Sequence, residues 1–161
     1  MPATVALLDA DLRGRADLAR ALDADVPDDW PPELLERGAL EWTRTQVRAH
    51  PDAPDWWMSY VLCDGTLIGT AGYKGPPDAS GTVEVGYSML PAHRRRGYAT
   101  EATRALIARA FADASVTRVI AETRPELAPS IGVLAKCGFR FIGEGSEPAV
   151  IRYERRRDET A

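Results

Sequence analysis

Between Thr82 and Phe111 the pattern of hydrophobic and polar positions changes its period. Over residues 82–89 apolar side chains alternate with polar or small ones, which is typical of a β-strand. Over residues 99–111 apolar side chains recur every three or four positions, which gives a helix one apolar face. The segment 90–98 between them carries three consecutive arginines and a glycine. The pattern therefore predicts a strand, a basic turn and an amphipathic helix.

The rest of the chain is divided by its apolar periodicity and by clusters of glycine and proline. We expect loops at 23–32 and 75–81, and a hairpin turn at Asp64 and Gly65. The expected strands are 4–8, 56–63, 66–74, 82–90, 119–123, 139–142 and 149–155. The expected helices are 12–22, from Pro31 or Pro32 to about His50, 99–111, and 130–137.

This order of elements predicts the α/β (α+β) class. Strands joined by short turns form an antiparallel meander, whereas the strand–helix–strand unit at 82–123 requires a parallel pair with a right-handed crossover. We therefore expect a mixed, mostly antiparallel sheet of about seven strands with a parallel central pair, flanked by about four helices. We expect residues 1–161 to form a single domain, in which residues 156–161 are a mobile charged tail.

Composition narrows the class of protein. With 161 residues, of which 45% are hydrophobic and 27% charged, the chain can form one domain with a real core. The net charge of −4 gives no support for nucleic-acid binding. No apolar run approaches the ~20 residues of a membrane span, and we expect a cytoplasmic protein with reduced cysteines. His50 and His93 are isolated, so we expect no metal site.

The basic turn has the chemistry of an anion site. A helix start carries N–H groups without helical partners and a partial positive charge, and both attract phosphate. Arg94, Arg95 and Arg96 add positive charge, and Gly97 lets the backbone approach a ligand closely. The residues alone therefore predict a pyrophosphate site at 94–100.

This turn resembles the coenzyme-A-binding motif of the GNAT superfamily of N-acetyltransferases, whose pattern is Gln/Arg-x-x-Gly-x-Gly/Ala. Residues 94–99 read Arg-Arg-Arg-Gly-Tyr-Ala, and residues 100–102 continue Thr-Glu-Ala, as in many members of the ribosomal-protein-acetylating (RimJ/RimL-like) branch. Residues 125–139 are similar to a second block, Asn-x-x-Ser-x-x-Val-Leu-x-Lys-x-Gly-Phe. The resemblance implies an acyltransferase that moves an acetyl group from acetyl-CoA directly to a primary amine, with no metal.

The resemblance also assigns residues to the coenzyme. The backbone N–H groups of residues 95–100 would face the pyrophosphate, and the arginines would add charge-assisted hydrogen bonds. The end of the preceding strand would run beside the pantetheine arm, and the backbone of residues 87–90 would contact the oxyanion. The expected coenzyme-binding residues are Met89, Leu90, Arg94, Arg95, Arg96, Gly97, Tyr98, Ala99 and Thr100.

Acetyl transfer requires a base for the amine and an acid for the departing thiolate. Glu84 and Glu122 are the candidate bases, directly or through water, and each could equally be a carboxylate on a solvated strand face. Ser130 matches the serine of the second block, where it could protonate the thiolate, or it could be a helix N-cap. Leu127 stands where the superfamily usually has asparagine, and Leu134 where many members have a tyrosine acid.

The acceptor site is the least patterned part. Trp30 lies in an acidic, proline-rich loop and is a candidate acceptor contact, although a core role for it stays open. Glu122, in the expected strand 119–123, is a second candidate acceptor contact. The acceptor could be a protein N-terminus or a small amine, and a homodimer is plausible. The alternatives are a non-catalytic CoA- or acyl-CoA-binding sensor or scaffold on the same fold, and a generic phosphate-binding domain.

Overall fold

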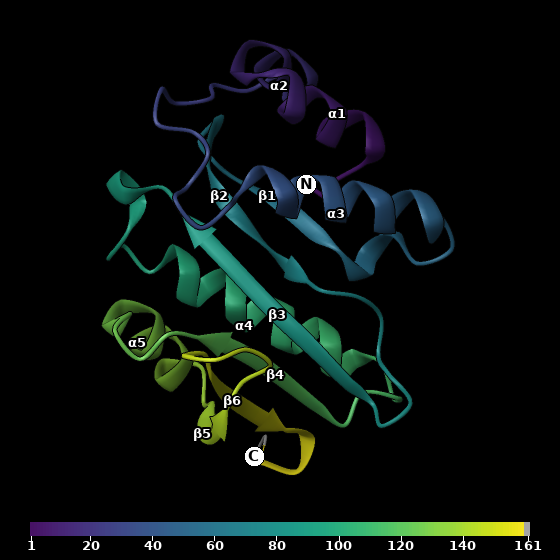
Figure 1. Cartoon of the computed structure of the whole chain (residues 1–161), viewed down its shortest axis with the longest axis vertical. Helices are drawn as coiled ribbons and strands as arrows, with labels where there is room; N and C mark the ends of the chain where they lie inside the picture. Colours follow the sequence, from purple (N-terminus) through teal and green to yellow (C-terminus); the bar gives the residue numbers. More distant parts are fainter. Residues whose placement is uncertain (160–161) are drawn as a thin grey trace. The chain divides into compact units, whose positions relative to one another are not determined.

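The computed structural model describes residues 1–159 of the chain (Figure 1). Within them lie five α-helices and six strands. The helices are α1 (Val5–Arg13), α2 (Arg15–Leu22), α3 (Arg37–Ala49), α4 (Tyr98–Ala112) and α5 (Ala128–Lys136). The strands are β1 (Met58–Cys63), β2 (Thr66–Tyr73), β3 (Thr82–Met89), β4 (Arg118–Thr123), β5 (Arg140–Glu144) and β6 (Ile151–Arg156). The strand order is β1-β2-β3-β4-β6-β5, which confirms a mixed sheet.

The structure has six strands and five helices, whereas the sequence predicted about seven strands and about four helices. The difference arises at the start of the chain. The expected strand at 4–8 is wrong, because Thr4 caps α1 by accepting a hydrogen bond from the Leu7 N–H at 3.1 Å. A short apolar run fits a buried helix as well as a strand. The residues before the cap bond to β1 instead, from the Ala3 N–H to the Met58 carbonyl at 2.9 Å.

Two expected helix boundaries also differ. The helix predicted at 12–22 is two helices, because Gly14, with φ of 143°, ends α1 and precedes α2. That backbone conformation is one that residues other than glycine rarely adopt. The helix predicted from Pro31 or Pro32 begins at Arg37, and the segment before it is a turn in which the Leu35 N–H donates to the Pro32 carbonyl at 2.9 Å.

The chain divides into two compact units, of which the first comprises residues 1–72 and 87–94. β1 and β2 form an antiparallel hairpin around Asp64 and Gly65, as expected. A Cβ on Gly69 of β2 would lie 2.4 Å from the Ser88 carbonyl oxygen, so only glycine fits there. The hydrophobic core of this unit includes Leu7, Leu8, Leu18, Leu22, Trp30, Leu40, Tyr60, Leu67 and Leu90.

The second unit comprises residues 73–86 and those from 95 onward. Here the first part of β3 pairs in parallel with β4, which confirms the expected crossover through α4. β4 and β6, and β6 and β5, pair antiparallel. Arg157, after β6, donates to the carbonyls of Val116 and Asp113 at 2.8 and 2.7 Å. The part of the expected tail at 160–161 lies outside the described residues.

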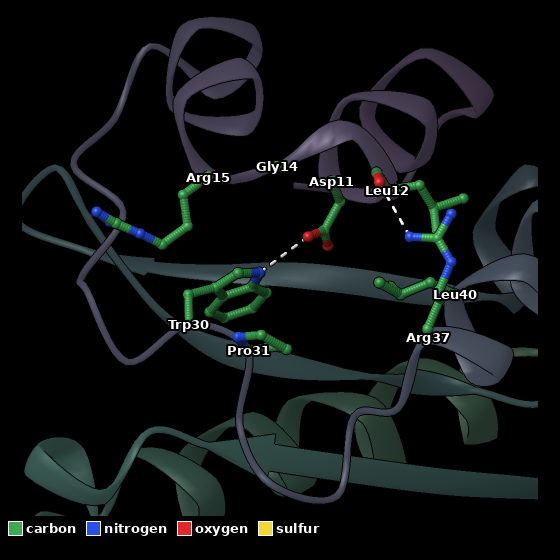
Figure 2. Close-up of a pocket in the computed structure, with 8 residues that line it drawn as sticks. All are labelled: Asp11, Leu12, Gly14, Arg15, Trp30, Pro31, Arg37 and Leu40. Carbon is green, nitrogen blue, oxygen red and sulfur yellow. Dashed lines mark hydrogen bonds between the residues drawn. The ribbon is translucent and has the colours of Figure 1, made fainter.

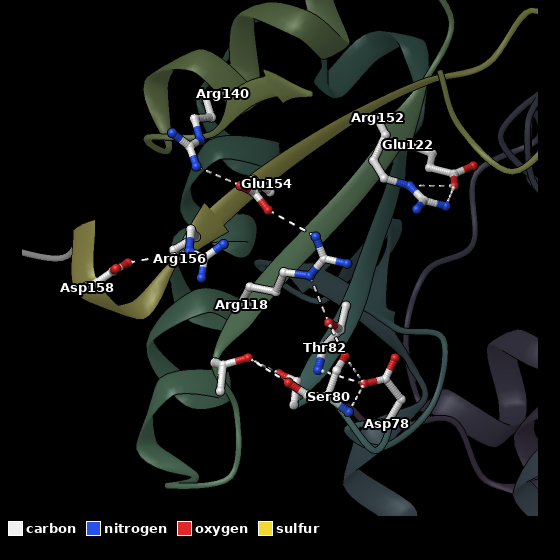
Figure 3. Close-up of polar contacts among 12 residues, drawn as sticks. Asp78, Ser80, Thr82, Arg118, Glu122, Arg140, Arg152, Glu154, Arg156 and Asp158 are labelled. Atoms are coloured by element: carbon white, nitrogen blue, oxygen red, sulfur yellow. Dashed lines mark hydrogen bonds and ion pairs between the residues drawn. The ribbon is translucent and has the colours of Figure 1, made fainter. Parts of the chain in front are cut away.

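A polar network joins the four strands of the second unit (Figure 3). Glu154 of β6, whose side chain is only 6% exposed, pairs with Arg118 of β4 at 3.0 Å and with Arg140 of β5 at 2.8 Å. Arg118 also donates to the Thr82 hydroxyl of β3 at 2.8 Å. The hydrogen bond from Arg140 lowers the pKa of the Glu154 carboxyl against the opposing effect of burial, and Arg118 adds to the lowering.

Across residues 1–159, no helix has the length and apolar character needed to cross a bilayer. Nor does any group of three or more histidine, cysteine or acidic side chains in that range gather as ligands for a metal ion.

Candidate functional site

The basic turn leads directly into the start of α4. After the 3₁₀ turn Pro91–His93, Arg95 adopts a left-handed conformation with φ of 61°, and Gly97 another with φ of 83°. Gly97 is the N-cap of α4, and the first helical hydrogen bond runs from the Glu101 N–H to its carbonyl at 2.9 Å. Among residues 1–159, no side chain caps this end. The first N–H groups of a helix have no helical acceptor, so this turn presents them to a ligand.

The three arginines of the turn fall into two groups. Arg94 folds back, donating from Nε to the Met89 carbonyl at 3.0 Å and pairing with Glu33 at 3.4 Å. Arg95 and Arg96 are exposed, and within the described part of the chain neither forms an ion pair. Arg94 therefore shapes the turn, while Arg95 and Arg96 supply its available positive charge.

The end of β3, in the first unit, is tightly held. Met89 and Leu90 are both buried, and the Leu90 N–H donates to the Ile68 carbonyl at 2.8 Å. That N–H is therefore engaged within the first unit and is not available for the oxyanion contact expected from residues 87–90. The buried side chains of Met89 and Leu90 offer little surface to any ligand that runs along this strand.

Glu84 lies on β3 within the second unit. Its Oε1 accepts from the Lys74 ammonium at 2.7 Å, and its side chain is 24% exposed. The backbone strengthens this pairing, because the Lys74 N–H donates to the Glu84 carbonyl at 3.0 Å. Lys74 is therefore the counter-ion of this carboxylate. Lys74 was not singled out from the sequence, because nothing in the pattern placed it opposite Glu84.

Glu122 of β4 is more constrained (Figure 3). Its Oε1 accepts from Arg152 at 2.7 Å and from the Ser146 N–H at 3.0 Å, and its Oε2 accepts from the Ser146 hydroxyl at 2.8 Å. Burial acts to raise the pKa of this carboxyl, but the hydrogen bonds from Arg152 and Ser146 outweigh it and the pKa is lowered. Both oxygens of Glu122 anchor the β5–β6 loop, so Glu84 is the better placed of the two candidate bases.

Ser130 and its neighbours lie at the start of α5. Leu127 is the N-cap of this helix and makes no side-chain hydrogen bond, so the N-cap alternative for Ser130 is wrong. Ser130 is half-buried in the first turn. Leu134 is 1% exposed and belongs to the core. A leucine at the cap cannot bind the first N–H groups of α5, as an asparagine there would.

Trp30 lines a pocket in the first unit (Figure 2). The pocket has a volume of about 230 Å³, and the indole N–H of Trp30 donates to Asp11 Oδ1 at 3.0 Å. The Tyr60 hydroxyl donates to the other oxygen of Asp11 at 2.9 Å. The lining residues are Asp11, Leu12, Gly14, Arg15, Trp30, Pro31, Arg37 and Leu40. Trp30 is itself 6% exposed, so it serves both core and pocket.

Sequence reasoning took Asp11 as a possible helix cap and did not identify it as a site residue, whereas it lies inside α1. It lies four residues after Leu7 and three after Leu8, which places it on the buried face of α1. A carboxylate on an apolar helix face is a detectable signal, but only once residues 5–13 are recognised as helical. Burial raises the pKa of the Asp11 carboxyl, and the hydrogen bonds from Trp30 and Tyr60 oppose that shift.

Comparison with known proteins gives these features a context. A family model described as acetyltransferase (GNAT) domain matches residues 7–140. The uncharacterized N-acetyltransferase YjdG of Bacillus subtilis is 33% identical over 93 residues, covering 58% of this chain and 55% of that protein. The chain thus spans about half the length of this curated relative.

Two solved structures share the fold. The ribosomal-protein-S5-alanine acetyltransferase of Vibrio fischeri has a TM-score of 0.70 at 17% identity, over 98% of this chain and 92% of that one. An aminoglycoside acetyltransferase, AAC(6')-Ib in complex with coenzyme A, has a TM-score of 0.67 at 16% identity, over 99% and 94% of the two chains. At such identities the likeness establishes the fold alone.

Proposed function

The chain belongs to the acetyltransferase (GNAT) domain family, and from that premise we propose that it transfers an acetyl group from acetyl-CoA to a primary amine. The observation that carries the proposal is the start of α4. There the left-handed Gly97 and the exposed Arg95 and Arg96 surround helix N–H groups that no side chain caps. Such a turn suits a pyrophosphate, because fixed N–H dipoles and guanidinium groups both favour its negative charge.

We assign the coenzyme to residues 89–100. Residues 95–100 would hold the pyrophosphate, and the backbone beside Met89 and Leu90 would follow the pantetheine arm. Arg94 acts indirectly, because its guanidinium holds the Met89 carbonyl and so fixes the path of the turn.

In the reaction, the amine nitrogen attacks the thioester carbonyl, a C–N bond forms, and the C–S bond breaks. Glu84, whose carboxylate pairs with Lys74, would take the proton that the attacking amine loses, directly or through a water. Ser130 would donate a proton to the departing thiolate and regain one from solvent, while Glu84 releases its proton to solvent, so that the proton lost by the amine balances the one gained by the CoA thiol. The place of Ser130 in the first turn of α5, with the N-cap role taken by Leu127, supports its assignment as the acid.

The acceptor is a primary amine, either a protein N-terminus or a small molecule. The two structural neighbours act, by their names, on a ribosomal-protein alanine and on aminoglycosides. Two cavities in this chain could serve an acceptor: the Trp30 pocket and a larger one of about 570 Å³ beside the β5–β6 loop. We also propose that the protein acts in the cytoplasm.

The test is thiol release from acetyl-CoA with a panel of primary amines, read against a blank without amine. Release that depends on both the amine and the protein supports the proposal. Bound CoA with no amine-dependent release contradicts it and supports a CoA-binding sensor on this fold. Two features favour that second candidate. Both oxygens of Glu122 are engaged in hydrogen bonds, and leucines stand at 127 and 134, where the superfamily has asparagine and a tyrosine acid.

A further inference from the structure

Asp11 is a carboxylate that the proposed chemistry does not use. It lies in the last turns of α1, and its two oxygens accept from neutral donors, the Trp30 indole N–H at 3.0 Å and the Tyr60 hydroxyl at 2.9 Å. Burial and the neighbouring Asp11 charge raise the pKa of the Tyr60 phenol, so this hydroxyl stays a donor. A negative charge near the C-terminal end of a helix is also disfavoured by the helix dipole.

No cation of the described residues compensates this charge. The two arginines that line the pocket are committed elsewhere. Arg15 donates to Asp28 at 2.6 and 2.9 Å, and Arg37 donates to Glu41 and to the Leu12 carbonyl, each at 3.1 Å. Figure 2 shows the Arg15 side chain extending away from Asp11, whereas the Asp11 carboxylate points at Trp30. A half-buried carboxylate without a counter-ion favours a cationic ligand.

The pocket beside Asp11 also suits the apolar part of a small cationic ligand. Leu12, Trp30, Pro31 and Leu40 give it apolar walls. Its volume of about 230 Å³ admits a small molecule. An indole beside a cation adds an attraction between the charge and the ring.

We propose that the Asp11–Trp30 pocket binds the ammonium group of a compact organic amine, with Asp11 as its counter-ion and the Trp30 indole beside its carbon body. This inference rests on the proposed function only in identifying that amine as the acceptor.

The test measures binding in the absence of coenzyme, by calorimetry at pH 7.5, with benzylamine as the probe and benzyl alcohol as its neutral counterpart. Wild-type protein should bind benzylammonium at least tenfold more tightly than benzyl alcohol. Asp11→Asn should remove that preference. The variant is expected to fold, because the new amide keeps one carbonyl acceptor and the Tyr60 hydroxyl can accept from its NH₂ group.

Asp29→Asn is the matched control, since Asp29 is an exposed carboxylate adjacent to Trp30 and lines no part of the pocket. Its binding should stay within twofold of wild type. Trp30→Phe is a second variant, which keeps the apolar wall and should weaken benzylammonium binding severalfold. Melting curves report whether each variant is folded.

Equal affinity of wild type for the two probes, or equal losses in Asp11→Asn and Asp29→Asn, would overturn the inference. The outcome is separable from that of the proposed function. Selective ammonium binding without any acetyl transfer supports the proposed ligand of this pocket and contradicts the proposed acetyltransferase activity. Acetyl transfer that is unchanged in Asp11→Asn, with no selective ammonium binding, supports the acetyltransferase activity and contradicts the inference about the pocket.

Discussion

Replacing Gly97 by glutamate should weaken CoA binding without a matching loss of fold. Gly97 has φ of 83°, and a Cβ built on it meets no atom within 4 Å. The substitution therefore costs backbone strain of about 1–2 kcal/mol and causes no clash in the protein itself. The new carboxylate stands at the helix start where we place the pyrophosphate.

The size of the effect follows from Coulomb's law. Two unit charges about 6 Å apart repel by about 0.7 kcal/mol at a dielectric constant of ~80 and by about 2.8 kcal/mol at ~20. For a pyrophosphate with two negative charges the sum is about 1.4–5.5 kcal/mol, so we expect CoA affinity to fall at least about tenfold.

Gly65→Glu supplies the matched control. Gly65, in the β1–β2 turn, has φ of 77° and equally open space around its Cβ position. The Gly65→Glu variant has the same backbone strain and the same new charge as Gly97→Glu, but residue 65 has no proposed contact with the coenzyme. Calorimetric titration with CoA, together with melting temperatures, separates the two effects. The assignment of the turn fails if Gly97→Glu binds CoA as tightly as Gly65→Glu does.

Three further substitutions test other parts of the account. Glu84→Gln should lower turnover more at neutral than at alkaline pH, because less amine is already deprotonated at neutral pH; an equal loss at both would move the base elsewhere. Glu154→Gln should cost about 2 kcal/mol of unfolding free energy at pH 7 in urea titrations, since it weakens two charged hydrogen bonds. The folded-state pKa of Glu154 is lowered, so its contribution is present above the ordinary glutamate pKa and is lost as pH falls through the folded value. The difference from wild type should therefore shrink in acid, while the exposed Glu144→Gln should show no such loss. Thr4→Ala should cost about 1 kcal/mol by removing the cap of α1, and an unchanged urea midpoint would contradict that role for Thr4.

The sequence determined the second half of the fold better than the first. From Thr82 to Phe111 the change of period is long enough to separate strand from helix, and the structure has both where expected. In residues 4–8 five apolar or small positions fit either element, and only the Thr4 cap decides for helix. Gly14 could not be recognised as a break, because an isolated glycine is tolerated in a helical pattern.

The candidate site divides in the same way. The turn at 94–100 is a local feature, so its glycine, its arginines and the helix start can be read along the chain. Glu84 pairs with Lys74, and Glu122 pairs with Ser146 and Arg152. No periodicity along the chain predicts these pairings. Asp11 meets Tyr60 across 49 positions, and only the folded chain shows that they share a pocket.

The central claim, that the start of α4 is the coenzyme site, is tested most directly by a CoA titration followed through backbone amide NMR signals. The account predicts the largest shifts at residues 95–100, and smaller ones at residues 87–90. Saturable CoA binding that leaves the amides of 95–100 unmoved and shifts another segment would contradict it.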